Sequence, residues 1–245
     1  MRWPALLLGV LLVLAGCGGD TRVAKVQPPF TPSGEGMEEV AAAPAGPSGR
    51  YLTARLLSPT ALRAGPGGRA LHRLGTRTEF GSRRVLSVVA RRAGWLAVIA
   101  SERPNGRVGW IPKRRVRLAS TNWSIHVDRS ARRLTLRRKG HAIRSFPVAV
   151  GRPGTETPTG RFAVTDKLHP GDPASPYGCC LLALSGHQTK LIAGWPGGDR
   201  LAIHATPNLW TVGKAASLGC MRARPADVRR LMRAVPAGTP VFIRA

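Results

Sequence analysis

Apolar residues recur at every second position over short stretches of the carboxyl-terminal half of the chain, and this spacing predicts half-buried β-strands. Such stretches lie at 125–127, 134–136, 146–150 and 162–164, and a last strand is expected at 240–243. One segment follows helical spacing instead, with Val228, Leu231 and Val235 three or four residues apart behind a proline that suits the first position of a helix. The pattern therefore predicts a mainly β protein with one short helix near its carboxyl end.

Residues 51–118 carry a second set of short apolar stretches, broken by turns at close intervals. These stretches lie at 85–89, 95–99 and 108–111. Strands so short and closely spaced predict a small β-barrel. The order of an LRAGPG opening at 62–67, a GWLAV strand, the turn Asn105-Gly106 and a closing GWI resembles the bacterial SH3-like domain. Members of that family often bind cell-wall peptides and often act only as spacers, and both roles stay open for this domain.

The amino terminus has the features of an export signal. Met1 and Arg2 precede an apolar run of 11 residues at 4–14, which is too short to cross about 30 Å of hydrocarbon but is typical of a signal-peptide core. The run ends in Leu-Ala-Gly-Cys at 14–17, which resembles the lipobox of bacterial lipoproteins. The resemblance implies a signal peptide at 1–16, cleavage before Cys17 and lipidation of that cysteine, with a plain secretory signal as the alternative. In both cases we expect an extracytoplasmic protein, and lipidation would anchor it to the bacterial cell membrane.

Residues 17–50 are rich in Gly, Pro, Ala, Ser and Glu, a composition that predicts a flexible tether behind the lipid anchor. The whole chain has 38 basic and 12 acidic side chains, a formal charge of +26, and such an excess implies a polyanionic neighbour. Because export argues against nucleic acid, we expect the partners to be the membrane surface and the anionic polymers of the cell envelope.

Two residues near the carboxyl end predict nucleophilic chemistry when they are taken together. His204 ends a short apolar run, and Cys220 follows a glycine 16 positions later. A thiol with a pKa of about 8.5 is a weak nucleophile at neutral pH, and histidine is the usual base that activates it. Gly219 would let the backbone approach closely and turn its amides inward, as an oxyanion hole requires. The pair therefore predicts a cysteine nucleophile with a histidine as its base.

Five motifs, in order, resemble those of the L,D-transpeptidases of bacterial peptidoglycan. They are a Gly-rich loop at 151–162 that ends in TPTGRF, IHA at 203–205, SLGCMR at 217–222, the helix after the proline at 225, and a closing GTPVFI strand at 238–243. The resemblance covers roughly 119–245 and implies a catalytic β-sandwich domain there, with the short helix after the cysteine. It also implies that peptidoglycan stem peptides are the substrate and that no metal or organic cofactor is needed.

The resemblance assigns roles to the residues of these motifs. Cys220 matches the nucleophile and His204 the general base. Ser217 and Gly219 match positions that shape the nucleophile's loop, with the amides of Gly219 and Cys220 as candidate oxyanion donors.

Other positions around the pair either depart from the family or are expected to contact substrate. Ala205 stands where many members have glycine but still supplies a backbone carbonyl, and Leu218 stands where many have a second histidine. Arg222 matches a position beside the site, where its charge would favour the thiolate or hold a substrate carboxylate. We expect Tyr177 and His187 to face the substrate cleft.

The implied reaction is acyl transfer in two steps. Cys220 attacks the carbonyl of the third residue of a donor stem, the terminal D-alanine leaves, and an amine of a neighbouring stem attacks the thioester to form a three-to-three cross-link, with His204 as base and then acid. The alternatives are an L,D-carboxypeptidase, in which water replaces the amine, and a non-catalytic wall-binding lipoprotein. The adjacent Cys179 and Cys180 either form a vicinal disulfide, cap the substrate cleft or have a structural role.

Overall fold

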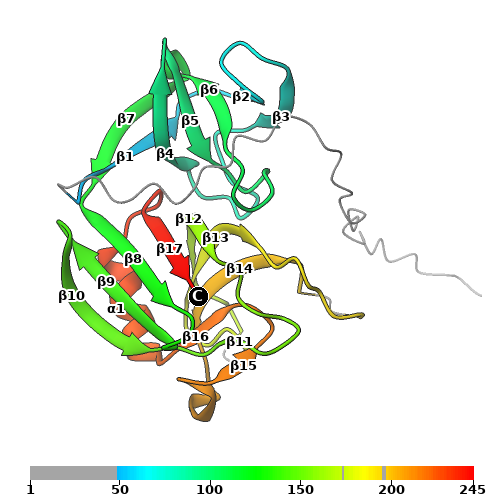
Figure 1. Ribbon diagram of the computed structural model, residues 1–245, viewed down its shortest axis with the longest axis vertical. Helices are drawn as coiled ribbons and strands as arrows, with labels where there is room; N and C mark the ends of the chain where they lie inside the picture. The colour runs from blue at the N-terminus through cyan, green and yellow to red at the C-terminus, as the bar shows by residue number, and fades with distance from the viewer. Residues whose placement is uncertain (1–48, 173, 195–196) are drawn as a thin grey trace, which may run out of the picture. The chain divides into compact units, whose positions relative to one another are not determined.

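The computed structural model describes residues 49–172, 174–194 and 197–245 (Figure 1). The predicted signal peptide, the lipidation site Cys17 and all but the last two residues of the predicted tether lie outside the described residues. Those that are described belong to one compact unit. Within them, the helices are all too short or too polar to cross a membrane.

The first part of the described chain is an antiparallel sheet with the strand order β3-β2-β6-β5-β4-β1-β7. Its strands are β1 (Tyr51–Leu56), β2 (Thr60–Arg63), β3 (Ala70–Leu74), β4 (Val85–Arg92), β5 (Trp95–Ile99), β6 (Gly109–Pro112) and β7 (Val116–Thr121). The three predicted apolar stretches of this part coincide with β4, β5 and β6. The last strand, β7, pairs with β1 along its whole length and therefore extends the sheet three residues beyond the predicted boundary at 118. The SH3-like assignment of this sheet stays a prediction.

A core of aliphatic side chains holds this sheet together. Leu62, Leu74, Leu96 and Ile111 are almost fully buried in one cluster. Gly109 is required beside Leu62, because a Cβ at position 109 would lie 2.4 Å from a Leu62 methyl carbon. The GWI motif is therefore explained by close packing against the core.

The second part is an eight-stranded sheet with the order β10-β9-β8-β17-β12-β13-β14-β16. Its strands are β8 (Trp123–Asp128), β9 (Arg133–Arg138), β10 (His141–Pro147), β12 (Gly160–Leu168), β13 (Leu181–His187), β14 (Arg200–Ala205), β16 (Met221–Ala223) and β17 (Pro240–Arg244). A small parallel pair, β11 (Val150–Gly151) with β15 (Ala215–Ser217), lies outside this order. The strands predicted at 125–127, 134–136, 162–164 and 240–243 coincide with β8, β9, β12 and β17, whereas the stretch predicted at 146–150 is divided between the end of β10 and the start of β11.

Where the sequence predicts a β-sandwich, the structure has one continuous sheet, in which hydrogen bonds link all eight strands, rather than two separate sheets. Strand β12 joins the halves, because residues 160–163 pair with β17 and residues 164–168 pair with β13. The register of β12 against β13 shifts between Val164 and Asp166, and such irregularities bend a strand and turn the corner between two faces. The result is a sheet that curves toward a barrel.

The predicted helix is confirmed as α1 (Pro225–Ala234). Its apolar face buries Val228 and Leu231, and it contacts β13 and β14. Asp227 in the first turn accepts two hydrogen bonds from the Arg144 guanidinium, at 3.1 and 3.0 Å from its Oδ1, and a negative charge there suits the positive end of the helix dipole. The helix thus covers the strand that carries the candidate base.

Direct bonds link the two parts of the described chain. Asn105 forms two hydrogen bonds with the backbone of His187, one to its carbonyl oxygen at 2.7 Å and one from its N–H at 2.9 Å. The Thr78 hydroxyl donates to the Asp166 carboxylate. The amino-terminal sheet therefore contacts the strand end that leads into the candidate site.

Candidate active site

The candidate nucleophile and base lie at the ends of neighbouring parallel strands. Strand β16 begins at the residue after Cys220 and pairs in parallel with β14, which puts His204 opposite Arg222 in the register. Because β16, the edge strand of the sheet, pairs only with the last three residues of β14, the residue just before β16 lies beside β14 a little before His204. Cys220 and His204 both line a cavity of about 260 Å³ at this edge.

Most of the residues expected at the cleft line this cavity. Tyr177, Ser217 and Arg222 do so together with Cys220 and His204. Another part of the lining comes from the segment that follows β13, up to the first residue of β14, whose lining residues sequence reasoning did not single out. It contributes Gln188, Lys190, Leu191, Ile192, Gly197, Gly198, Asp199 and Arg200.

His204 is held as a neutral base. Its Nδ1 lies 2.6 Å from the carbonyl oxygen of Ala205, so the tautomer that donates from Nδ1 is favoured and Nε2 keeps its lone pair for a proton. The pKa of His204 is lowered to about 4, chiefly by burial; the Ala205 bond raises it in part, and the charge of Arg222 contributes a smaller lowering. The ring edge of Tyr177 packs against it with 5.0 Å between ring centroids. The position of Ala205 fits the orienting role that the sequence predicts.

The thiol of Cys220 is uncharged at rest. Burial raises its pKa, while a backbone hydrogen bond and the charge of Arg222 lower it. Its Sγ lies 3.8 Å from the carbonyl oxygen of Arg200, a weak hydrogen bond. A raised thiol pKa beside a lowered imidazole pKa means that the resting pair is neutral, and that Arg222 favours the thiolate over the imidazolium.

The loop before Cys220 is fixed by side chains outside its own motif. The hydroxyl of Thr155 donates to the carbonyl of Ser217 at 3.2 Å, and the hydroxyl of Thr157 donates to the carbonyl of Gly219 at 2.8 Å. Both threonines come from the Gly-rich loop at 151–162, whose function sequence reasoning left undefined. The motif thus supports the nucleophile's loop.

The two candidate oxyanion donors differ in their surroundings. The N–H of Gly219 donates to the Ser217 hydroxyl at 3.1 Å. For the N–H of Cys220 the described part of the chain provides no hydrogen-bond acceptor. Cys220 is therefore the more available donor, and Ser217 acts on the loop by holding Gly219.

His187 does not line the cavity. Its Nδ1 lies 2.9 Å from the Asp199 carboxylate and its Nε2 lies 2.6 Å from the carbonyl oxygen of Ser101. The side chain thus bridges the amino-terminal sheet and the cavity wall. The expected contact of His187 with substrate finds no geometric support.

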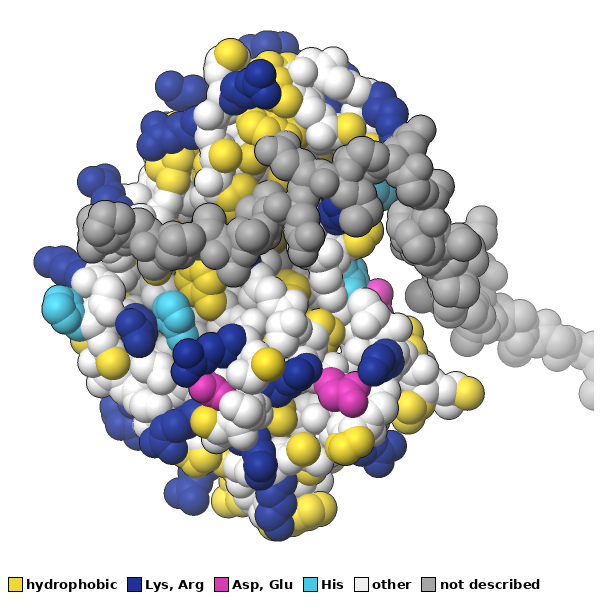
Figure 2. All heavy atoms as spheres, viewed as in Figure 1, with side chains coloured by type: hydrophobic (Ala, Val, Ile, Leu, Met, Phe, Trp, Pro, Cys, Tyr) yellow, Lys and Arg dark blue, Asp and Glu magenta, His cyan; other side chains and the backbone are white. Residues whose placement is uncertain are grey.

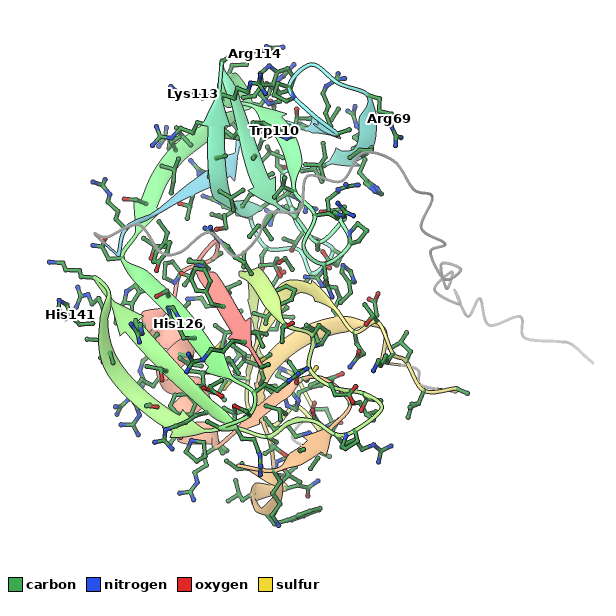
Figure 3. All side chains as sticks on the ribbon, in the orientation of Figure 1. Arg69, Trp110, Lys113, Arg114, His126 and His141 are labelled. Carbon is green, nitrogen blue, oxygen red and sulfur yellow. The ribbon has the colours of Figure 1, made fainter. Side chains whose placement is uncertain are left out.

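Other histidines and cysteines stand apart from this chemistry. Figure 3 shows His126 and His141 on β8 and β10. His126 stacks on Phe242 with 4.9 Å between ring centroids, and burial lowers its pKa to about 4. Cys179 and Cys180 are both free thiols, and burial raises the pKa of Cys180 to about 12. Across the described residues, no three His, Cys, Asp or Glu side chains are grouped so as to hold a metal.

The second part of the chain has relatives among known proteins. Residues 122–243 match the family model described as YkuD, the L,D-transpeptidase catalytic domain. The chain is 35% identical over 121 residues to YkuD of Bacillus subtilis (strain 168), which is named as a presumed L,D-transpeptidase, and 31% identical over 108 residues to YqjB of the same strain, which is named likewise. The matches cover 49% and 40% of this chain, and 65% and 57% of the two relatives. By sequence, residues 122–243 thus form a catalytic domain of the L,D-transpeptidase YkuD family.

Solved structures show a weaker likeness. An L,D-transpeptidase of Enterococcus faecium is 22% identical with a TM-score of 0.37, and the match covers 50% of this chain and 49% of that chain. L,D-transpeptidase 3 from Mycobacterium tuberculosis is 19% identical with a TM-score of 0.41, covering 56% of this chain and 74% of that chain. The family assignment rests on the sequence match alone.

Proposed function

We propose that this protein is an L,D-transpeptidase that forms three-to-three cross-links between peptidoglycan stem peptides through a thioester on Cys220. One observation carries the proposal. Parallel pairing of β14 with β16 brings His204 and Cys220 to one cavity, with His204 bound through Nδ1 to the Ala205 carbonyl. This is the arrangement of nucleophile, base and orienting acceptor that cysteine acyl transfer requires.

The first half-reaction acylates the enzyme. The Sγ proton of Cys220 passes to Nε2 of His204, and the thiolate attacks the carbonyl carbon of the third stem residue. The tetrahedral oxyanion is stabilised by the N–H of Cys220. The C–N bond then breaks, the imidazolium returns its proton to the amine of the leaving D-alanine, and a thioester remains.

The second half-reaction transfers the acyl group. An amine of a neighbouring stem attacks the thioester carbonyl and gives its proton to His204. The C–S bond breaks, and the proton returns from His204 to the Cys220 thiolate, so the enzyme is restored. Because the resting pair is neutral, Arg222 assists by stabilising the transient thiolate in both halves.

The envelope location belongs to the same proposal. A lipid anchor at Cys17 and a tether up to residue 50 would hold the folded part near the membrane, outside the cytoplasm. On the face drawn in Figure 2, Lys and Arg side chains are spread widely over the described surface and Asp and Glu are few. Such a surface suits anionic polymers of the cell envelope.

Product analysis tests this function against its alternatives. The purified protein is incubated with a disaccharide tetrapeptide, with the Cys220→Ala variant beside it, and the products are identified by liquid chromatography and mass spectrometry. A cross-linked dimer with release of one D-alanine, absent from the variant, is expected. A disaccharide tripeptide with D-alanine and no dimer would make the protein an L,D-carboxypeptidase. Binding of the muropeptide without formation of any product would support the remaining alternative, a non-catalytic wall-binding lipoprotein.

A further inference from the structure

Three successive carbonyl groups of the nucleophile's loop each accept a hydrogen bond from a side chain of another segment. Thr155 binds the Ser217 carbonyl and Thr157 binds the Gly219 carbonyl, as described above. The middle carbonyl, that of Leu218, accepts from Nε2 of Gln188 at 2.9 Å. The loop is therefore held from outside at every peptide between Ser217 and Cys220.

Fixing a carbonyl also fixes the amide that follows it. In a planar trans peptide the C=O and the next N–H point in opposite directions. The bond of Gln188 to the Leu218 carbonyl thus sets the direction of the Gly219 N–H, and the bond of Thr157 to the Gly219 carbonyl sets that of the Cys220 N–H. These are the two candidate oxyanion donors.

Gln188 does more than either threonine, because its carboxamide joins two loops. Nε2 also lies 3.0 Å from the Thr155 carbonyl oxygen and 3.2 Å from that of Glu156, and Oε1 accepts from the N–H of Lys190. The side chain is buried. Three carbonyl oxygens around one nitrogen demand an N–H donor, so a carboxylate of the same shape would meet only repulsion there.

The local backbone makes room for this side chain. Gly219 has φ of +122°, and a Cβ at that position would lie 2.3 Å from Nε2 of Gln188. The glycine before the nucleophile therefore allows the carboxamide to reach the Leu218 carbonyl. No pattern in the sequence marks Gln188, which lies 32 residues before Cys220.

We propose that Gln188 is a positioning residue for acyl transfer, whose carboxamide ties the loop at 155–156 to the loop at 217–219 and so holds the oxyanion donors beside Cys220. This inference rests on the proposed function. It predicts that Gln188 affects steps that develop an oxyanion and leaves simple alkylation of the thiol largely unaffected, since alkylation creates no oxyanion.

The test compares two reactions of the same thiol in the purified protein. Acylation of Cys220 by a carbapenem and its alkylation by iodoacetamide are followed by intact-protein mass spectrometry for the parent, Gln188→Glu and Gln188→Met. The ratio of the two rate constants corrects for changes in thiolate fraction. Ser185→Ala is the matched control, because the Ser185 hydroxyl is buried on β13, three residues before Gln188, and its partner among the described residues is the Ala163 N–H, away from both loops.

We expect the acylation-to-alkylation ratio to fall by about tenfold or more in both Gln188 variants and to stay within about twofold of the parent in Ser185→Ala. In Gln188→Glu the fall in the acylation-to-alkylation ratio, relative to the parent, should become smaller as the pH is lowered. Burial among carbonyls raises the pKa of the introduced carboxyl, and its protonated form regains a donor. A merely structural role would give a loss without this pH dependence.

The outcomes separate this inference from the proposed function. An unchanged ratio in folded Gln188→Glu and Gln188→Met, with the parent acylated, would overturn the positioning role alone. A parent that is alkylated but neither acylated nor active on muropeptide would refute the proposed function. Amide hydrogen exchange of the peptide spanning 215–223 is independent of both reactions. Its exchange should be faster in the Gln188 variants than in Ser185→Ala, and equal exchange would also contradict the inference.

Discussion

Gly219→Ala places a single methyl group at the point where the two loops meet. The new Cβ would lie 2.3 Å from Nε2 and 3.1 Å from Cδ of Gln188, on a residue whose φ is +122°. The carboxamide must therefore retreat from the Leu218 carbonyl, or the loop must move. A retreat of the carboxamide releases the Leu218 carbonyl and with it the Gly219 amide, and a movement of the loop displaces the amides of both Gly219 and Cys220.

The magnitude follows from two contributions. An alanine in this backbone region costs about 1–3 kcal/mol. Displacing Gln188 weakens its bond to the Leu218 carbonyl, which contributes a net of about 0.5–1.5 kcal/mol. Together these amount to about 1.5–4.5 kcal/mol, or a fall in Tm of about 3–18 °C for a domain of this size.

Gly154→Ala is a matched control in the facing loop. Gly154 also has a positive φ, +86°, but a Cβ there meets nothing within 4 Å. It should therefore show only the backbone strain of about 1–2 kcal/mol, with acylation of Cys220 retained.

The assay combines thermal unfolding with the acylation rate measured by intact mass. We expect Gly219→Ala to lose most of its acylation rate at a temperature where it is still folded, and Gly154→Ala to keep it. Equal acylation rates in the two variants would refute the reasoning. Backbone strain alone would then explain the loss of activity, and the collision with Gln188 would have no effect.

Three further perturbations test other parts of the structure. Because burial lowers the pKa of His204 to about 4, the unfolded chain binds a proton between about pH 6.5 and 4 that the folded protein does not. Stability measured by denaturant titration should therefore fall as the pH drops through this window, by up to about 3 kcal/mol from this residue, and less so in His204→Gln. Arg222→Met should raise the pKa of Cys220, seen as a shift of about one unit in the pH profile of alkylation, whereas Arg222→Lys should restore it; identical profiles would remove Arg222 from the account. Leu231→Ala, which truncates a buried side chain of α1, should lower the free energy of unfolding by about 2–5 kcal/mol. Ile143→Ala, at an exposed position, should lower it by only about 0.5 kcal/mol. Equal losses in the two variants would contradict the packing of α1.

Much of the fold was accessible from the sequence because it depends on local periodicity. The strands around 95–99 and 125–127 and the helix after Pro225 follow from apolar spacing, which decides which face of an element is buried. The continuity of the second sheet did not follow from it. That depends on the shift in β12 between Val164 and Asp166, and a bulge leaves little trace in a pattern of apolar residues.

The candidate site, like the fold, could be predicted from the sequence only in part. His204 and Cys220 were found because their chemistry is rare and their motifs are short. Gln188 was missed because its function depends on reaching carbonyl groups of two distant loops, and a buried amide has no spacing that predicts its partners. His187 was expected in the cleft, but Asn105 and Ser101, in the loop between β5 and β6, hold it instead. Such long-range bonds are set by tertiary packing.

The most direct test of the central claim is to trap the acyl-enzyme formed from a stem tetrapeptide. The purified protein is quenched with acid within the first turnovers and digested, and the peptide that holds Cys220 is examined by mass spectrometry. The account predicts a mass increase equal to the donor lacking its terminal D-alanine, lost on treatment with hydroxylamine and absent from His204→Gln on the same time scale. A folded protein that turns over the donor while Cys220 stays unmodified, or that carries the acyl group on another residue, would contradict it.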